Sequence, residues 1–327
     1  MIRYYSNYNL DLVKMKKILC IFCIYFSSSL AIAEIKCQSK PIIQVITLKK
    51  LTTVASCYME NENYKEAFVW YLKAANKGDK HAQNLVASMY YFGDGVEKDH
   101  SLSFKWFKKL AKSGEVQAQN KVAEMYLYAQ GIEENATKAF SWYQLAAKKE
   151  DSLSMSKVAQ MYYEGKGVKQ NYENAFIWYM KLAKYGYSDA QSKVAEMYYF
   201  AQGKKKNMKE ALVWFTKAAE QEDVFSKSML GSFYFKGEGV VQDYAKAYRF
   251  SLDPAKKDYD YAQNIMAQLY EKGYGVEKDY VQAYAWYTLA ASHDIDYATA
   301  QLEVLEKKMS KEEIEKAENL ELLLPQM

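Results

Sequence analysis

Tryptophan recurs along the chain at a fixed interval of 36 residues. Phe250 fills one slot of the series, and the other slots hold every tryptophan of the sequence: Trp70, Trp106, Trp142, Trp178, Trp214 and Trp286. Self-similarity at a period of about 20–50 residues is typical of repeat proteins, in which each unit packs only against its neighbours. The chain is therefore predicted to form a solenoid of repeats without a single central core.

The spacing of apolar residues predicts two helices in each repeat. In the unit that follows Asp79, residues Ala82, Val86, Met89 and Tyr90 recur on one helix face. Glycine readily takes the left-handed backbone of a helix C-cap, so the glycine pair of Gly93-Asp94-Gly95 is expected to end this first helix.

The second helix is predicted to begin at Asp99, whose side-chain oxygen can cap it. Its inner side is predicted to carry Ser103, Trp106, Phe107 and Leu110. A small residue recurs at one position of each helix and lets neighbouring helices approach to about 8–10 Å. These positions are Ala82, Ala118, Ser154, Ala190, Ser226, Ala262 and Ala298 in the first helix, and Ala67, Ser103, Ala139, Ala175, Ala211, Ala247 and Ala283 in the second.

The combined pattern resembles the Sel-one-like repeat (SLR), a relative of the tetratricopeptide repeat. The double-glycine turn, the Val and Asp after it and the A-x-x-W-[YF] core recur together over residues 79 to about 293. The resemblance implies an all-α fold, a right-handed α/α solenoid of stacked antiparallel helix pairs with a concave face lined by the first helices. The chain departs from the family where Ala129 and Ala201 replace the first loop glycine, and where alanine replaces a glycine within the first helix, at Ala87, Ala123, Ala159 and Ala195.

The ends of the chain differ from the central repeats. A Ser with Glu three residues later, Ser310 and Glu313, predicts a capping box that opens a final helix. The expected segments are an N-terminal extension with a signal peptide (1–33), a linker (34–43), a first repeat of tetratricopeptide length (44–78), six 36-residue SLR repeats (79–293), and a C-terminal half repeat with a capping helix (294–327).

One repeat is irregular, because Phe250 replaces the tryptophan and Pro254 occupies a helical position. A proline inside a helix removes a hydrogen bond and clashes with the preceding turn, at a cost of about 3 kcal/mol or more. The helix from Tyr244 to about Lys257 is expected to kink or to end early. A tolerated substitution near the helix end is the alternative.

The N-terminal segment has the pattern of a signal peptide. From Met15, two lysines precede a short apolar run that ends in Ala31-Ile32-Ala33. We expect translation to start at Met15 and cleavage to follow Ala33, which predicts an exported protein, periplasmic or secreted. The apolar run is short for a membrane span of about 20 residues, so no stable span is expected after cleavage. A membrane anchor formed by an uncleaved signal is the alternative.

Cleavage would leave two of the four cysteines, Cys37 and Cys57. An even pair in an exported chain permits one disulfide between them, and two buried thiols are the alternative. The remaining chain would carry 40 basic and 39 acidic residues, a balance that argues against nucleic acid as a partner. The one basic cluster, 204–206 with Lys209, lies in a predicted loop and is interpreted as solvated, with contact to an acidic partner as the less favoured interpretation.

No catalytic or metal-binding motif stands out. The three histidines lie far apart without a second ligand at metal spacing, and the G-x-G turns end helices, unlike nucleotide-binding loops. Ser154 and Lys157 match S-x-x-K, the nucleophile motif of penicillin-recognising enzymes, but its companion elements are missing and Ser154 is a packing position. We predict a protein without enzymatic activity or cofactor, with a penicillin-recognising or hydrolase activity as the least favoured interpretation.

The outer side of the first helices offers a candidate binding surface. Large aromatic residues recur late in these helices: Tyr91, Phe92, Tyr128, Tyr163, Tyr199, Phe200 and Phe235. Tyrosine joins a large contact area to a hydroxyl group at low entropic cost, which suits peptide recognition. The alternative is that these rings pack against the next repeat.

The predicted function is therefore that of an exported scaffold or adaptor for other proteins. By resemblance to bacterial SLR proteins, it would act as a monomer in the cell envelope or in contact with a host, on a protein or peptide partner. Because aromatic rings also stack on sugars, a cell-wall glycan or peptidoglycan fragment in the same groove is the second hypothesis.

Overall fold

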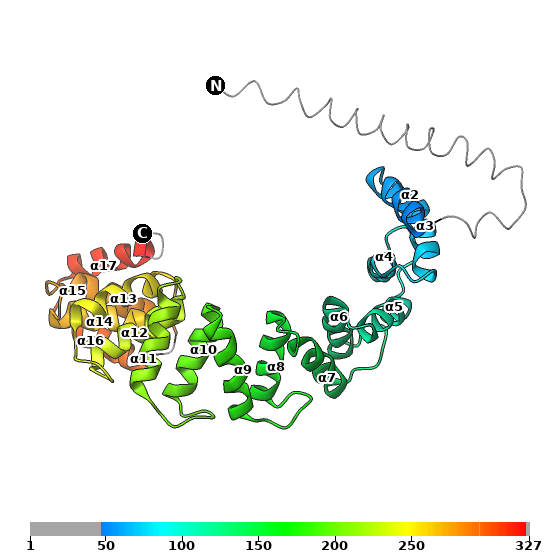
Figure 1. Cartoon of the computed structure of the whole chain (residues 1–327). Helices are drawn as coiled ribbons and strands as arrows, with labels where there is room; N and C mark the ends of the chain where they lie inside the picture. The colour runs from blue at the N-terminus through cyan, green and yellow to red at the C-terminus, as the bar shows by residue number, and fades with distance from the viewer. Residues whose placement is uncertain (1–46, 294, 325–327) are drawn as a thin grey trace, which may run out of the picture. The chain divides into compact units, whose positions relative to one another are not determined.

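The structure is a computed structural model that describes residues 47–293 and 295–324 (Figure 1). The chain divides into two compact units, with the boundary between Lys149 and Glu150. The described residues form α-helices joined by short turns, and they contain no β-strand. The first unit contains α2 (Leu48–Glu60), α3 (Tyr64–Asn76), α4 (Lys80–Phe92), α5 (His100–Lys112), α6 (Val116–Leu127) and α7 (Ala136–Ala147). The second contains α8 (Ser152–Glu164), α9 (Tyr172–Lys184), α10 (Ser188–Tyr199), α11 (Met208–Ala219), α12 (Val224–Lys236), α13 (Tyr244–Lys256), α14 (Asp260–Lys272), α15 (Tyr280–Ala291), α16 (Asp296–Glu306) and α17 (Lys311–Leu323).

Within each unit, each helix up to α15 packs against the next helix along the chain, and α16 and α17 both pack against α15. Each repeat therefore contributes one pair of helices, and contacts are made between neighbours in sequence. This arrangement confirms the predicted all-α repeat solenoid.

Polar side chains begin the helices where the sequence predicts caps. The Oδ1 of Asp99 accepts a hydrogen bond from the backbone N–H of Leu102 at 2.8 Å, and the same contact recurs at Asn171 with Asn174. Such a cap satisfies one of the N–H groups that have no partner inside the helix, and stabilises the helix by about 1 kcal/mol.

The ends of α4, α8, α12 and α14 are formed by a glycine in the left-handed conformation, and it is the first glycine of each loop. Gly93 ends α4 with φ 88°, and the backbone N–H of Gly93 bonds to the carbonyl of Met89. Ala129 and Ala201, which replace this glycine, still take positive φ values of 52° and 59°. The fold therefore imposes this backbone shape even on residues with a Cβ.

The small residues of both helices are buried, which confirms the predicted close packing of neighbouring helices. Ala82 on α4 and Ala67 on α3 have no exposed surface, and Ser103 on α5 is equally buried. The hydroxyl of Ser103 donates to the carbonyl of Ala87 at 2.7 Å, so a serine is tolerated at a helix contact that alanine usually fills.

The predicted inner position of the repeated tryptophan is correct only in part. Trp106 is half-buried, while Phe107 beside it is 5% exposed and lies in the core. Trp70 is half-buried in the same way, and the Nζ of Lys73 lies 4.1 Å from its ring centre. In these repeats the tryptophan closes the edge of the core, where a lysine can cover its ring. Trp214 and Trp286 are 8% and 1% exposed and lie in the core as predicted.

A buried glutamine links successive repeats, a contact that the sequence patterns did not predict. The Nε2 of Gln83 donates to the carbonyl of Ala75 at 3.0 Å, across the turn from α3 to α4. The same bond recurs from Gln119, Gln191 and Gln263 to Ala111, Ala183 and Ala255. Each of these carbonyl groups also accepts a backbone N–H from the turn that follows, so the glutamine adds a second hydrogen bond at the end of the helix.

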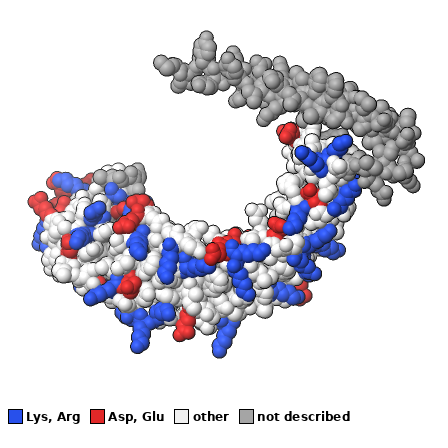
Figure 2. Space-filling model, in the orientation of Figure 1, with Lys and Arg blue, Asp and Glu red and all other residues white. Residues whose placement is uncertain are grey.

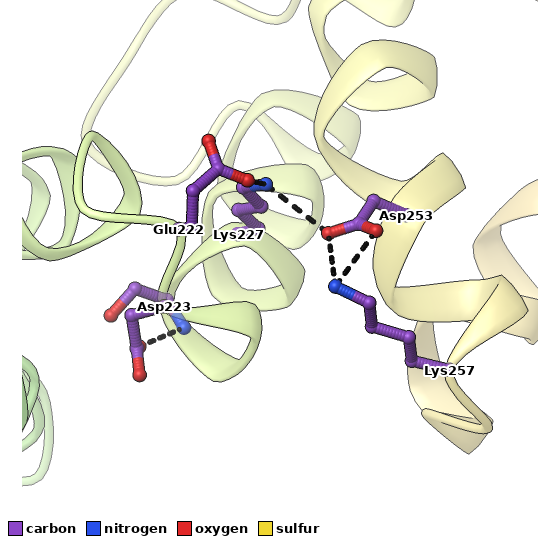
Figure 3. A network of polar contacts seen from close by, with 6 residues as sticks. Glu222, Asp223, Lys227, Asp253 and Lys257 are labelled. Carbon is purple, nitrogen blue, oxygen red and sulfur yellow. Dashed lines mark hydrogen bonds and ion pairs between the residues drawn. The ribbon is translucent and has the colours of Figure 1, made fainter. Parts of the chain in front are cut away.

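Lys227 occupies the glutamine position of α12, and it forms ion pairs (Figure 3). Its side chain is 15% exposed, and its Nζ contacts Glu222 and lies 3.1 Å from the Oδ2 of Asp253 on α13. Asp253 also pairs with Lys257 at 3.0 Å, so one carboxylate joins α12 to the end of α13. The hydrogen bond to Glu222 raises the pKa of Lys227 above its ordinary value.

The expectation that Pro254 shortens its helix is wrong. Helix α13 runs from Tyr244 to Lys256 and contains Pro254 in its last turn. Proline has no backbone N–H, so at this position only the carbonyl of Phe250, four residues earlier, lacks its helical hydrogen bond. The alternative of a tolerated substitution near the helix end describes this site better.

The final helix begins as predicted. At the start of α17 the Ser310 hydroxyl accepts a hydrogen bond from the backbone N–H of Glu313, and the Glu313 carboxylate accepts one from the backbone N–H of Ser310, which completes a capping box. Ala317 and Leu324 of this helix are buried in the core of the last repeat. The predictions for the signal peptide, the cleavage site, the linker and Cys37 fall outside the described residues, so the pairing of Cys37 with Cys57 of α2 stays a prediction.

Candidate functional site

The seven aromatic residues of the predicted row fall into two adjacent columns of the repeat. Tyr91, Tyr163, Tyr199 and Phe235 occupy one position, and we name them the inner column. Phe92, Tyr128 and Phe200 occupy the next position, and we name them the outer column. A helix turns by about 100° per residue, so one step in sequence separates two different environments.

The inner column is half-buried and contacts the following repeat. The hydroxyl of Tyr163 donates to the Oε1 of Gln202 at 3.0 Å, and the hydroxyl of Tyr199 lies 3.5 Å from the Oε2 of Glu238. Each of these partners is 39 residues further along the chain, in the loop of the next repeat. Burial, followed by the charge of Glu238, raises the pKa of Tyr199. The inner column therefore joins one repeat to the next.

Tyr91 and Phe235 make equivalent packing contacts. The Tyr91 ring stacks on His100 with centres 4.8 Å apart, and Phe235 meets the edge of Tyr244 at 5.9 Å. In the repeat between Tyr91 and Tyr163 the same position holds Leu127, which is 8% exposed. For these residues the packing interpretation that the sequence left open describes the contacts.

Lysines of the following repeat cover two rings of the inner column. The Nζ of Lys121 lies 4.1 Å from the ring centre of Tyr91, and that of Lys193 lies 5.4 Å from the ring centre of Tyr163. Both lysines also pair with a glutamate one turn on, Lys193 with Glu196 at 2.7 Å. These cations were not predicted, although Lys121 and Lys193 occupy one repeat position and alignment of the repeats could have indicated them.

The outer column is exposed to solvent. Phe92 is 66%, Tyr128 61% and Phe200 57% exposed. Phe92 meets the edge of Tyr91 at 5.0 Å, and Phe200 meets the edge of Tyr199 at 4.7 Å. The half-buried rings thus support exposed rings whose own burial contributes little to folding. Glu164 occupies the outer position between Tyr128 and Phe200 and accepts a hydrogen bond from Gln160.

The row ends at a buried carboxylate. Glu271 takes the inner position of α14 and is 4% exposed. Its oxygens accept hydrogen bonds from the hydroxyl of Tyr287 at 2.8 Å and from Lys272 at 2.7 Å. Burial raises the pKa of Tyr287, and the hydrogen bond to Glu271 adds to the rise. The sequence indicated that the aromatic row stops here, but not that the glutamate is buried and paired.

The side chains considered for chemistry are used in other contacts. Ser154 is fully buried and hydrogen-bonds to Asp151, so its hydroxyl is not presented to a substrate. His100 stacks on Tyr91, and His293 pairs with Asp258 at 2.8 Å. Within residues 47–293 and 295–324 no three metal-ligating side chains come together. None of the helices described combines the length and the apolar character needed to cross a membrane.

Charges of both signs are mixed over the face of the repeats seen in Figure 2. One hollow of the second unit is lined by no residue of either column. It has a volume of about 690 Å³ and is lined by Tyr248 and Tyr270, whose hydroxyl oxygens are 3.2 Å apart. The exposed rings of the outer column, Phe92 and Tyr128 in the first unit and Phe200 in the second, therefore do not line that hollow.

Comparison with known families gives one clear result. The family model of the Sel1 repeat matches seven segments: residues 59–79, 80–115, 116–151, 152–187, 188–223, 225–251 and 260–294. The matched segments together cover more than half of the chain. Among proteins with curated descriptions, none matches the chain.

Solved structures with the same fold include a Sel1 repeat protein from Oxalobacter formigenes. That protein is 27% identical over 79% of this chain and 76% of its own length, with a TM-score of 0.60. A protective antigen from uropathogenic Escherichia coli with an SLR fold is 24% identical over 97% of this chain and 85% of its own, with a TM-score of 0.43. An immunity protein from Pseudomonas aeruginosa is 19% identical over 66% of this chain and 83% of its own, with a TM-score of 0.34.

Proposed function

The chain belongs to the Sel1 repeat family, and on this basis we propose that it is an exported, non-enzymatic scaffold that binds a protein or peptide through the outer column. Sel1 repeat proteins are generally non-catalytic and commonly mediate protein interactions. The outer column is Phe92, Tyr128 and Phe200, which lie at the same position of three repeats.

One observation carries this proposal. The three rings are 57–66% exposed although each stands beside a position that is half-buried or buried. Packing accounts for the inner column, because its half-buried members contact side chains of their own repeat or of the next one. It does not account for the outer column, since exposed apolar rings gain little by folding. Tyrosine and phenylalanine are frequent anchors of protein interfaces.

The experiment replaces the three rings together. A variant with Phe92→Ser, Tyr128→Ser and Phe200→Ser is compared with the natural chain in affinity capture from the cell envelope of its source, followed by mass spectrometry. We expect a partner that the natural chain retains and the variant loses by at least about tenfold, as is usual when interface anchors are truncated.

The matched control removes exposed apolar residues at another repeat position. Val69, Ile177 and Val213 lie at one position of the second helices and are 39%, 58% and 46% exposed. A variant with all three changed to serine is expected to keep the partner. The proposal is wrong if the control loses the partner to the same extent, or if the outer-column variant keeps it. If the natural chain binds purified cell wall and the outer-column variant does not, the glycan hypothesis is favoured instead.

Export is part of the proposal and rests on the N-terminal pattern. The lysines after Met15, the apolar run and Ala31-Ile32-Ala33 are the parts that a signal peptidase reads. Mass spectrometry of the protein recovered from cells is expected to give a mature N-terminus at Glu34. A chain that retains residues 15–33 would contradict cleavage and favour the anchored form.

A further inference from the structure

A basic surface surrounds one ring of the outer column. Phe200 is followed by the loop from α10 to α11, in which Lys204, Lys205 and Lys206 are all exposed. Lys209, in the first turn of α11, is exposed as well. We name Phe200 and these four lysines the basic loop surface.

Contacts with neighbouring rings hold this surface together. The Phe200 ring lies 4.7 Å from the ring of Tyr199, and the Nζ of Lys206 lies 5.2 Å from the same ring. The Nζ of Lys204 lies 5.1 Å from the ring of Phe176 on α9. An apolar ring and several cations are therefore presented side by side.

Two carboxylates on neighbouring elements have partners of their own. Glu196 on α10 pairs with Lys193 at 2.7 Å, and Glu238 faces the hydroxyl of Tyr199. The basic loop surface is thus suited to a partner that brings its own carboxylates together with an apolar side chain.

The last helix of the chain presents such a face. On α17, the exposed residues away from the buried Ala317 include a set that we name the acidic helix face: Glu312, Glu315, Glu318, Leu322 and Leu323. Glu312 also pairs with Lys316 on the same helix at 2.8 Å. The side chains of Leu322 and Leu323 are 67% and 52% exposed. Two exposed leucines at the end of a row of glutamates match an exposed phenylalanine beside a row of lysines.

We propose that the acidic helix face of one copy of the chain binds the basic loop surface of a second copy. In its own chain α17 packs against α15, with Ala317 and Leu324 in the core, so the acidic helix face points away from that contact. Two different surfaces meet in this interface, so the first copy keeps its basic loop surface free and the second copy keeps its acidic helix face free for further copies. The chain therefore associates head to tail, in contrast to the monomer expected from the sequence.

This interface goes beyond the proposed function and shares only Phe200 with it. The two proposals are tested separately, because self-association is measured with the purified chain alone and partner capture identifies a different protein. A failure of self-association leaves the capture result unchanged.

The first measurement is sedimentation velocity of the protein as recovered from cells, over a range of concentrations. We expect the average mass to rise with concentration in about 0.1 M salt and to return to the monomer in about 1 M salt, because the screening length falls from about 10 Å to about 3 Å. A monomer at every concentration in low salt overturns the proposal.

Charge reversal tests the assignment of the two surfaces. A loop variant carries Lys204→Glu, Lys205→Glu and Lys206→Glu, and a helix variant carries Glu315→Lys and Glu318→Lys. Each alone is expected to weaken association by at least about tenfold, because like charges then face each other. An equal mixture of the two variants, or one chain with both sets of changes, is expected to restore association.

The control places the same change of charge in other loops. Lys98, Lys166 and Lys169 are exposed loop residues, and their triple change to glutamate is expected to leave association unaltered. A loop variant with glutamine in place of glutamate provides a milder test of the same lysines, should the reversed charges disturb folding. Association that survives the loop and helix variants, or that the mixture does not restore, overturns the proposed interface.

Discussion

Gly203 lies directly against the backbone of Tyr172, the first residue of α9. A Cβ placed on Gly203 would be 2.3 Å from the carbonyl oxygen of Tyr172, and Gly203 also has a φ of +69°. The same approach recurs between Gly95 and Tyr64 in the first unit. The second glycine of the loop therefore sets how closely one repeat packs on the preceding one.

Replacement of Gly203 by alanine is expected to cost about 2–4 kcal/mol, since a left-handed backbone and a backbone clash add up. Gly165 provides the matched control, because its φ is +75° but the nearest atom to an added Cβ is the Cβ of Gln170 at 3.1 Å. Gly165→Ala is expected to cost about 1–2 kcal/mol. Urea unfolding of both variants, followed by circular dichroism, measures the difference. Equal losses would show that the backbone clash is relieved without cost.

Ala201 offers the opposite change. Its φ is 59°, a conformation that costs an alanine about 1–2 kcal/mol but suits glycine. Glycine also makes the unfolded chain more flexible, at a cost of about 0.4–1 kcal/mol. Ala201→Gly is therefore expected to stabilise the protein by about 0.5–1 kcal/mol in urea unfolding.

Ala195→Gly, within α10 of the same repeat, is the matched control for Ala201→Gly. Because glycine is a poor helix former, this second change is expected to destabilise by about 1 kcal/mol or more. If Ala201→Gly destabilises as well, the left-handed strain at this position has been overestimated.

The ion pairs of Lys227 predict a dependence of stability on pH. Partial burial raises the pKa of Asp253, but the hydrogen bonds from Lys257 and Lys227 outweigh it and hold this pKa below its ordinary value of 3.8. A carboxyl group with a lowered pKa stabilises the fold above its ordinary pKa, and this contribution is lost as the pH falls through the lowered value. Lys227→Met is expected to cost about 0.5–1 kcal/mol at pH 7.

As the pH falls below the ordinary Asp pKa of 3.8, the difference between Lys227→Met and the natural chain is expected to shrink, because Asp253 becomes protonated in both. Urea unfolding at several pH values measures it. Lys80→Met is the control, since it removes the exposed pair of Lys80 with Glu115 and should cost less than about 0.5 kcal/mol. If the difference in unfolding free energy between Lys227→Met and the natural chain stays constant down to low pH, the loss comes from packing of the lysine side chain and not from its ion pairs.

Much of the fold follows from the period of 36 residues. The caps at Asp99 and Ser310, the glycine at the end of α4 and the buried small residues depend on local spacing within one repeat. Pro254 shows the limit of that reasoning, since the cost of a proline depends on whether it stands in the last turn. Contacts between repeats, such as Gly203 with Tyr172, depend on the angle between helix pairs, which spacing does not specify.

The candidate site was predicted in outline and not in detail. The sequence places aromatic residues late in the first helices, but it does not tell which of the neighbours Tyr199 and Phe200 is the more buried. Their environments differ because Tyr199 reaches Glu238 of the next repeat, while Phe200 is 57% exposed. The lysines that cover Tyr91 and Tyr163 are 30 residues away from the rings and could be assigned only once the repeats were packed.

The two columns predict opposite effects of the same substitution. Tyr163→Ala removes a half-buried ring and its hydrogen bond to Gln202, and is expected to cost about 1–3 kcal/mol. Phe200→Ala removes an exposed ring and is expected to change stability by less than about 0.5 kcal/mol. Thermal unfolding of both variants measures this contrast.

Tyr163→Phe separates the hydrogen bond from the ring, because it keeps the packing and loses only the hydroxyl. It is expected to recover all but about 1 kcal/mol of the loss. If Phe200→Ala proves as destabilising as Tyr163→Ala, the exposed ring is needed for folding. Its exposure then no longer supports the outer column as a binding surface. If Phe200→Ala leaves the stability unchanged, any loss of partner binding in this variant reports on recognition, because the fold that presents the ring is intact.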